Sequence, residues 1–314
     1  MEDNKMVNLP AGKEERTAMG EKEAIEVLKT YRDESGKSQS AIARELGVSA
    51  AAISSFLSGS YKAPHTLIPK IEALLSNVEN KSLAPKAPGF ALTGISKRVM
   101  DAIEYCHLQG KIGVIYGDAG IGKTMAIREY VRENPMSIYI TISPAFATMS
   151  GVNDLLSEVV GVREKNSRRI YMELISRLKE SGRVIIIDEA QHLTKKTLEH
   201  LRSIADESGV GVCLVGNEEV YTRLKGTGKA DFAQIFSRIA RREPVFLSNV
   251  KRLDIEKIFF ESHLDEETID FLFKIAGTKY GIRGAVNVYV AAVALFDTVD
   301  AAAVVRVAKQ MNIG

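Results

Sequence analysis

The stretch VIYGDAGIGKTMAI, residues 114–127, contains an apolar strand, a glycine-rich turn and the start of a helical segment, in that order. Its turn matches the pattern GxxxxGK[ST] in full. Glycines let the backbone curl so that several N–H groups face one phosphate, and the dipole of the following helix adds to the attraction for an anion. The stretch therefore predicts a site for a nucleoside triphosphate at one edge of an α/β sheet.

The residues of this turn have separate expected roles. Lys123 is placed to reach the β- and γ-phosphates of ATP, and the hydroxyl of Thr124 is placed to coordinate Mg²⁺. The expected nucleotide-binding residues of the turn are Gly117, Asp118, Ala119, Gly120, Ile121, Gly122, Lys123 and Thr124.

A second motif, RVIIIDEAQHL (183–193), supplies the other half of the expected site. Its four apolar residues predict a buried strand, and Asp188 follows at the carboxyl end, where open α/β sheets bind ligands. Asp188 is expected to hold Mg²⁺ through water, and Glu189 to polarise the attacking water. The alternative for Glu189 is a solvated carboxylate at a strand end.

A third apolar run, GVGVCLVGNEEV (209–220), ends at Asn217. A polar side chain there is placed to sense the γ-phosphate and the attacking water, as a catalytic residue of the sensor type. The alternative is an asparagine that only forms the turn after Gly216.

Buried strands alternate with helices from about residue 93 to residue 249, which predicts a parallel sheet of five strands. The segments after residue 250 are helical, and the proline-containing stretch 81–92 is typical of a linker. The expected strands are 112–116, 138–142, 184–187, 210–215 and 244–247. The expected domains are a mobile arm 1–20, a helical domain 21–80, a linker 81–92, a nucleotide-binding core 93–249 and a helical lid 250–314.

Composition narrows the class of protein. The net charge is +2, so any surface for nucleic acid must be a local patch. Cys106 and Cys213 show no metal-type spacing and are expected to be reduced core thiols. No run of about 18 apolar residues is present, and we expect a soluble, cytoplasmic protein without a membrane partner.

The strand order and the two nucleotide motifs resemble the AAA+ ATPases. This resemblance implies a site completed by an arginine of a neighbouring subunit, and FSRIARR (236–242) is similar to the arginine-finger motif of clamp loaders and initiators. It implies Arg238 as the catalytic finger, with Arg241 or Arg242 as alternatives. The alternative is that these arginines form only a basic helix end, where their charge interacts favourably with the helix dipole. GIRGAVN (281–287) resembles the sensor segment of the AAA+ lid and implies Arg283 as a nucleotide contact.

The N-terminal stretch QSAIARELGVSAAAISSFLSG (39–59) predicts a helix-turn-helix and resembles the phage repressor and Cro class. Its second helix carries small residues and none suited to bidentate base contacts, so we expect weak or sequence-tolerant DNA contact. Arg44 and Lys62 are the candidates for phosphate contacts. The alternative is a protein-docking module that never touches DNA.

A basic segment, GVREKNSRRIYMELISRLKESGR (161–183), lies between the two nucleotide motifs. Such a segment can follow the backbone of double-stranded DNA on the inner surface of a subunit assembly. A solvated helix face is the equal alternative, and Lys97 and Arg98 are weaker candidates. The expected DNA-binding residues of the segment are Arg163, Lys165, Arg168, Arg169 and Arg177.

The combination of a Cro-like module, a proline-containing linker, a minimal AAA+ core and a short helical tail is similar to the transposition protein B family of Mu-like phages. That resemblance implies an ATPase that assembles as an ATP-dependent helical filament on DNA, delivers it to a transposase and takes part in target immunity, in the host cytoplasm if phage-encoded. Two alternatives are a helicase loader or insertion-sequence accessory ATPase, and an ATP-gated DNA-binding regulator.

Overall fold

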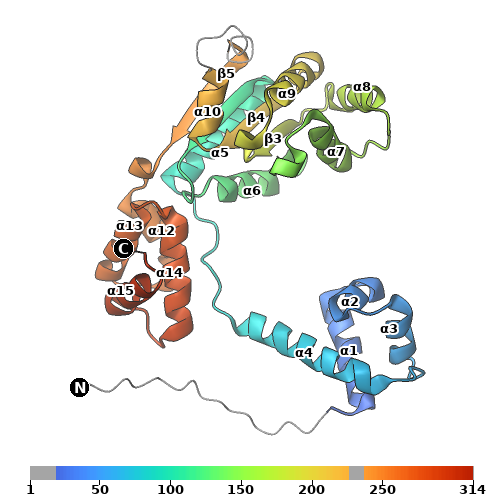
Figure 1. The fold of residues 1–314 in the computed structure, drawn as a ribbon. Helices are drawn as coiled ribbons and strands as arrows, with labels where there is room; N and C mark the ends of the chain where they lie inside the picture. The colour runs from blue at the N-terminus through green and yellow to red at the C-terminus, as the bar shows by residue number, and fades with distance from the viewer. Residues whose placement is uncertain (1–18, 226–236, 314) are drawn as a thin grey trace. The chain divides into compact units, whose positions relative to one another are not determined.

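A computed structural model describes residues 19–225 and 237–313 of the chain (Figure 1). The chain divides into two units, Met1–Ala84 and Pro85–Gly314. Each unit has its own hydrophobic core, and the two are described in turn.

The described part of the first unit, residues 19–84, contains four helices around a small core. Its helices are α1 (Glu21–Ser35), α2 (Gln39–Leu46), α3 (Ala50–Leu57) and α4 (Pro64–Leu83). Ile42, Ile53 and Phe56 are fully buried between the helices. Gly47 adopts the left-handed conformation at the end of α2, and the Ser49 side chain caps α3. The predicted helix-turn-helix is confirmed.

The second unit is built on a parallel five-stranded sheet with the strand order β2-β3-β4-β1-β5. This confirms the predicted α/β architecture. The strands are β1 (Ile112–Gly117), β2 (Ile138–Thr141), β3 (Val184–Asp188), β4 (Gly211–Gly216) and β5 (Ile239–Val245).

Helices cover both faces of this sheet (Figure 1). The helices of the core are α5 (Gly94–Gln109), α6 (Lys123–Glu133), α7 (Met149–Val160), α8 (Ser167–Leu178), α9 (Lys195–Ser208) and α10 (Glu218–Lys225). Successive strand residues point to opposite faces, so Ile115 packs in the cluster that contains α5 and α6, while Val114 packs in the cluster of α7 to α10. The central strands of a sheet covered on both faces must be apolar, which explains the continuous apolar runs in the sequence.

The end of the chain forms a helical lid of α12 (Arg252–Ile258), α13 (Glu266–Ala276), α14 (Gly281–Leu295) and α15 (Ala301–Gln310). Leu272, Val288 and Val304 are fully buried where α13, α14 and α15 pack together. These side chains belong to the same hydrophobic cluster as Ile115 of the sheet. The lid therefore shares a core with the sheet.

Two predicted boundaries are wrong. Strand β5 covers Ile239–Val245 rather than 244–247, because an edge strand exposes one side to solvent and so accommodates arginines and a proline. Arg241 and Arg242, placed by the sequence before the last strand, lie within it. Helix α4 also continues to Leu83, three residues into the predicted linker.

Candidate functional site

The turn after β1 is shaped by glycines and followed directly by α6. Gly120 and Gly122 have positive φ angles of 73° and 101°, which glycine adopts without strain. A side chain at Gly117 would collide with the backbone of Val245, so only glycine permits this approach of the turn to β5. The first turn of α6 begins at Lys123, and its N-terminus faces the loop.

The Lys123 side chain is folded over the turn. Its Nζ donates to the carbonyl oxygens of Gly117 at 3.1 Å and Asp118 at 2.6 Å. Burial lowers the pKa of Lys123, and the carboxylates of Asp188 and Glu189 oppose that shift. The ammonium group is thus held, partly desolvated, in a position from which it can neutralise an anion on the loop.

Asp188 lies at the carboxyl end of β3 and is only 2% exposed. Its Oδ2 accepts the hydroxyl of Thr124 at 2.8 Å, and its Oδ1 accepts the backbone N–H of Glu189 at 2.9 Å. Burial raises the pKa of Asp188, although the hydrogen bond from Thr124 opposes the shift. The structure therefore brings together the two oxygen groups that the sequence predicts to share a Mg²⁺ ion.

Glu189 adopts a left-handed backbone conformation with a φ of 57°. A non-glycine residue is uncommon in that region, and such residues concentrate at functional sites. Its carboxylate accepts a hydrogen bond from the Gln191 side chain, and the Gln191 Oε1 accepts the backbone N–H of Asn217 at 3.3 Å. Gln191 was not predicted from the sequence, because residue spacing alone gives no signal for it.

Asn217 lies where β4 ends, as expected, and has two structural roles. Its Oδ1 accepts the backbone N–H of Glu219 at 3.0 Å and so caps the start of α10. The residue also lines the same cavity as Lys123 and Asp188. The cap supports the alternative that Asn217 only shapes the turn after Gly216. Because Asn217 also lines the cavity, its role as a sensor of the γ-phosphate stays a prediction.

The lid closes one side of the site. The backbone N–H of Arg283, in the first turn of α14, donates to the carbonyl oxygen of Gly120 at 2.9 Å. Side chains at Gly120 or Gly281 would meet the backbone of the other segment, so glycine at both positions allows the loop and α14 to touch. Arg283 itself is exposed and lines the cavity.

A cavity of about 500 Å³ is lined by most of these groups. The predicted nucleotide-binding residues Gly117 and Asp118 are not among its lining residues. Its polar end is formed by the turn 119–124 with Asp188, Glu189, Gln191 and Asn217. Its other walls come from a stretch that the sequence assigned to the linker and from apolar lid residues. The lining residues missed by the sequence analysis are Ala87, Pro88, Gly89, Phe90, Ala91, Thr93, Ser96, Met125, Arg128, Gln191, Gly216, Ile258, Ile282 and Val286.

The finger candidates lie away from this cavity. Strand register pairs Ile112 with Ile239 and Gly117 with Val245, so Arg238 lies beside the start of β1, about 20 Å from the turn in the same subunit. Its guanidinium is 3.8 Å from the carboxylate of Asp206. Because of this separation, Arg238 can complete a nucleotide site only in another subunit.

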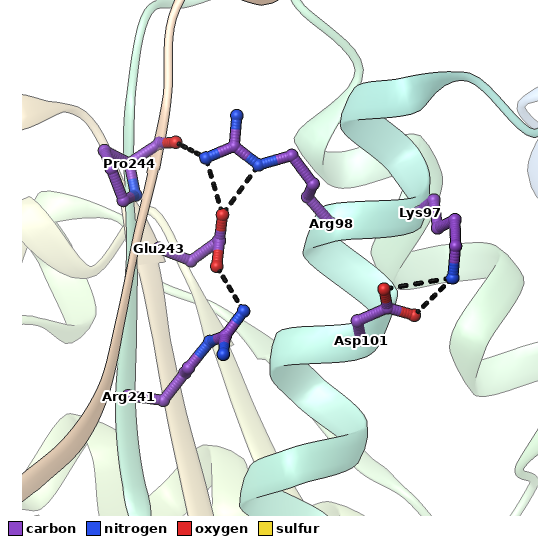
Figure 2. Close-up of polar contacts among 6 residues, drawn as sticks. All are labelled: Lys97, Arg98, Asp101, Arg241, Glu243 and Pro244. Atoms are coloured by element: carbon purple, nitrogen blue, oxygen red, sulfur yellow. Dashed lines mark hydrogen bonds and ion pairs between the residues drawn. The ribbon is translucent and has the colours of Figure 1, made fainter.

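Arg241, Arg98 and Lys97 each form an ion pair with a residue of the same unit (Figure 2). Glu243 is 5% exposed and accepts Arg98 at 2.7 Å through one oxygen and Arg241 at 2.7 Å through the other. Lys97 pairs with Asp101 on the same helix at 3.1 Å. These ion pairs favour structural roles for Lys97, Arg98 and Arg241. Arg242 is exposed on β5.

The basic segment forms a second hollow, of about 860 Å³, lined by the loop that joins α7 to α8 and by residues of α8. The lining residues are Gly161, Arg163, Glu164, Lys165, Asn166, Arg169, Glu173 and Arg177. Arg177 pairs with Glu173 at 2.7 Å, and Arg168 is exposed but is not among the lining residues. Four of the five predicted DNA contacts in this segment therefore surround one hollow.

In the first unit, Arg44 and Lys62 are both exposed. The Arg44 Nε donates to the carbonyl oxygen of Ser40 at 3.4 Å, one turn earlier on α2. Both side chains remain accessible to a phosphate backbone.

Comparison with known proteins identifies the class of each unit. Residues 107–224 match the AAA domain family, and residues 28–76 match the Helix-turn-helix family. A structure titled "Structure of Drosophila ORC bound to DNA" superposes with a TM-score of 0.52 at 13% identity, over 76% of this chain and 66% of that one. That likeness shows the fold alone.

Two curated relatives go further than the domain class. The chain is 30% identical over 276 residues to the Mu-like prophage FluMu DNA transposition protein B of Haemophilus influenzae, covering 84% of this chain and 94% of the relative. It is also 30% identical over 247 residues to the ATP-dependent target DNA activator B of Escherichia phage Mu, covering 77% and 78% of the two chains. The chain belongs to the family of Mu-like DNA transposition protein B.

Proposed function

We propose that this protein is an ATP-hydrolysing activator of target DNA in transposition. The observation that carries the proposal is the contact of Thr124 with Asp188 at 2.8 Å, beside Lys123 and Glu189, in a cavity of about 500 Å³. Membership of the transposition protein B family and the presence of the helix-turn-helix unit support DNA as the partner.

The residues of the cavity divide between the two ends of ATP. The backbone N–H groups of the turn and the Lys123 ammonium bind the phosphates, and Arg283 adds a positive charge from the lid. Apolar side chains such as Pro88, Ile258 and Val286 also line the cavity, and a purine base would gain from leaving water against them.

The oxygen donors fit a magnesium ion, because Mg²⁺ prefers carboxylate and hydroxyl oxygen and keeps several waters. Thr124 and Asp188 would hold the ion, which when bound neutralises charge on the β- and γ-phosphates. Glu189 acts as the acceptor that orients and polarises the attacking water, and Asn217 orients the γ-phosphate. Arg238 of one subunit completes the site of the next.

The same γ-phosphate would control assembly. Lys123 of one subunit and Arg238 of its neighbour both contact it, so ATP stabilises the interface and hydrolysis releases it. We propose that ATP-bound subunits form a helical filament on double-stranded DNA, using Arg163, Lys165 and Arg169 on the phosphate backbone. A transposase that stimulates hydrolysis would clear the filament, which accounts for target immunity.

The described residues, 19–225 and 237–313, include no helix with the length and apolar character needed to cross a bilayer. The proposed partners are DNA, the transposase and further copies of this chain.

Electron microscopy of negatively stained samples tests the proposal directly. The full chain is mixed with random-sequence duplex DNA and with a slowly hydrolysed ATP analogue, ADP or no nucleotide. Filaments that coat DNA only with the analogue support the proposal, and Lys123→Ala should abolish them. Closed rings, or no assembly on DNA in any nucleotide state, would instead favour a helicase loader or a partner-gated regulator.

A further inference from the structure

Gln191 occupies a position between the two strand ends that carry the proposed catalytic groups. It lies in the short turn 190–192 after β3 and is 8% exposed. One end of its amide contacts the Glu189 carboxylate, and the other contacts the backbone of Asn217. It is therefore a polar side chain buried beside the γ-phosphate end of the cavity, and the proposed hydrolytic mechanism assigns it no role.

The two partners fix the orientation of the amide. A carboxylate only accepts hydrogen bonds and a backbone N–H only donates them, so the Gln191 Nε2 must face Glu189 and the Oε1 must face Asn217. A flipped amide would place a donor against a donor and an oxygen against a carboxylate. The glutamine thus joins the two strand ends in one defined arrangement.

The surrounding backbone is shaped to receive this side chain. A methyl group on Gly216 would collide with the Gln191 Oε1 and with the Val220 side chain, so the absence of a side chain at that position makes room for both. The turn itself is anchored by Ala190 and Leu193, which are buried in the core, and by the hydrogen bond from His192 N to Glu189 O at 3.1 Å. The position of the amide is consequently set by the fold.

We infer that Gln191 is a positioning residue that holds the Glu189 carboxylate and couples it to the end of β4. The inference rests on the proposed function, since it assigns Gln191 to the same hydrolytic site. Glu189 has a left-handed backbone and a flexible side chain, so a fixed donor is needed to select one carboxylate position for the attacking water. Because Gln191 also accepts from Asn217, a shift of β4 on binding the γ-phosphate moves the donor that orients Glu189.

The test is steady-state ATP hydrolysis by the full chain on duplex DNA. Gln191→Met keeps the side-chain volume and removes both hydrogen-bonding groups, and we expect kcat to fall about 10- to 100-fold with KM for ATP changed less than about threefold. Gln191→Glu keeps the acceptor for Asn217 but places a carboxylate against Glu189, so its kcat should fall at least as far. His192→Ala, at an exposed residue of the same turn, should stay within about twofold of wild type.

A double-mutant cycle separates positioning from a merely structural role. If Gln191 acts through Glu189, adding Gln191→Met to Glu189→Gln should change the residual single-turnover rate by less than about twofold. A structural residue would instead add its full effect in that background.

The outcomes are distinguishable from failure of the proposed function. Binding of a slowly hydrolysed ATP analogue with unchanged affinity shows that each variant is folded. Wild-type kcat in Gln191→Met, or additive effects in the cycle, would overturn the inference alone. A wild-type chain that does not hydrolyse ATP would overturn both the inference and the proposed ATPase.

Discussion

The carboxylate of Asp118, in the turn after β1, accepts the backbone N–H of Leu247 at 2.7 Å. The Asp118 N–H also donates to the carbonyl oxygen of Val245 at 3.1 Å. Leu247 begins the short segment that joins β5 to the lid. Since Arg283 of the lid contacts Gly120 from the other side, the turn is held at both ends by the segments that position the lid.

Removing the hydrogen bond between the Asp118 carboxylate and the Leu247 N–H should uncouple the lid from the bound nucleotide. We expect Asp118→Ala to weaken binding of an ATP analogue about 10- to 150-fold, because a hydrogen bond to a charged acceptor contributes about 1.5–3 kcal/mol. Asp118→Asn keeps an acceptor and should be affected less. Calorimetric titration measures both variants, and equal affinity of Asp118→Ala and wild type would show that this hydrogen bond does not contribute to binding.

Binding of ATP should depend on pH through Lys123. Burial lowers the pKa of the free protein's Lys123 below its ordinary value of 10.5, and bound phosphates would raise it again. The affinity is then constant below the lowered pKa and falls as the pH rises between the free and bound values, by at most about tenfold per pH unit. The loss of affinity therefore begins below pH 10.5.

Lys123→Arg is the matched variant for this pH dependence. Arginine remains charged throughout this pH range. The variant should bind ATP more weakly than the wild type because the guanidinium differs in shape from the ammonium, but its affinity should not fall as the pH rises. Calorimetry in two buffers of different ionisation enthalpy also reports the proton taken up by the wild type. The same decline in Lys123→Arg would assign the titration to another group.

The architecture and the polar end of the site could be predicted from the sequence because both depend on local patterns. Apolar runs of strand length, a fixed glycine spacing and the acidic residues after β3 place Lys123, Thr124 and Asp188 at one sheet edge before any tertiary contact is known. The same pattern places Asn217 beside them at the end of β4.

The parts that were missed or misplaced depend on tertiary contacts. Strand β5 is recognised only once its place at the sheet edge is known, since edge exposure explains its arginines. The stretch 87–91 has the composition of a linker, yet it forms a wall of the cavity. The space for the Gln191 amide depends on Gly216, which follows it in sequence and which no spacing rule connects to it.

Arg238 should act on the site of a neighbouring subunit. Subunits with Arg238→Ala keep Glu189 but lack the proposed finger, and subunits with Glu189→Gln keep the finger but lack the carboxylate. Each variant alone should therefore be nearly inactive. In an equal mixture, about a quarter of random interfaces combine the intact halves and should regain hydrolysis. The ATPase rate of the mixture on DNA measures this gain.

The alternative fingers give the control for this experiment. Arg242 is exposed on β5, and Arg242→Ala should hydrolyse ATP alone at nearly the wild-type rate if Arg238 is the finger. Normal hydrolysis by Arg238→Ala alone would place the finger elsewhere. In that case the contact of Arg238 with Asp206 would have a structural role.

The hollow formed by the basic segment should bind phosphates of the DNA backbone. Arg163 and Arg169 line it, so removing both charges should reduce the slope of log K against log salt by about 0.9 for each phosphate that is no longer neutralised, whatever the DNA sequence. Arg132→Ala is the matched control, because the Arg132 side chain is 68% exposed on α6 outside the hollow. Fluorescence anisotropy with a labelled duplex and the ATP analogue, at several salt concentrations, gives each slope. An unchanged slope in the double variant Arg163→Ala/Arg169→Ala would mean that the hollow is a solvated surface and that DNA binds elsewhere, with Arg44 and Lys62 of the helix-turn-helix next to be tested.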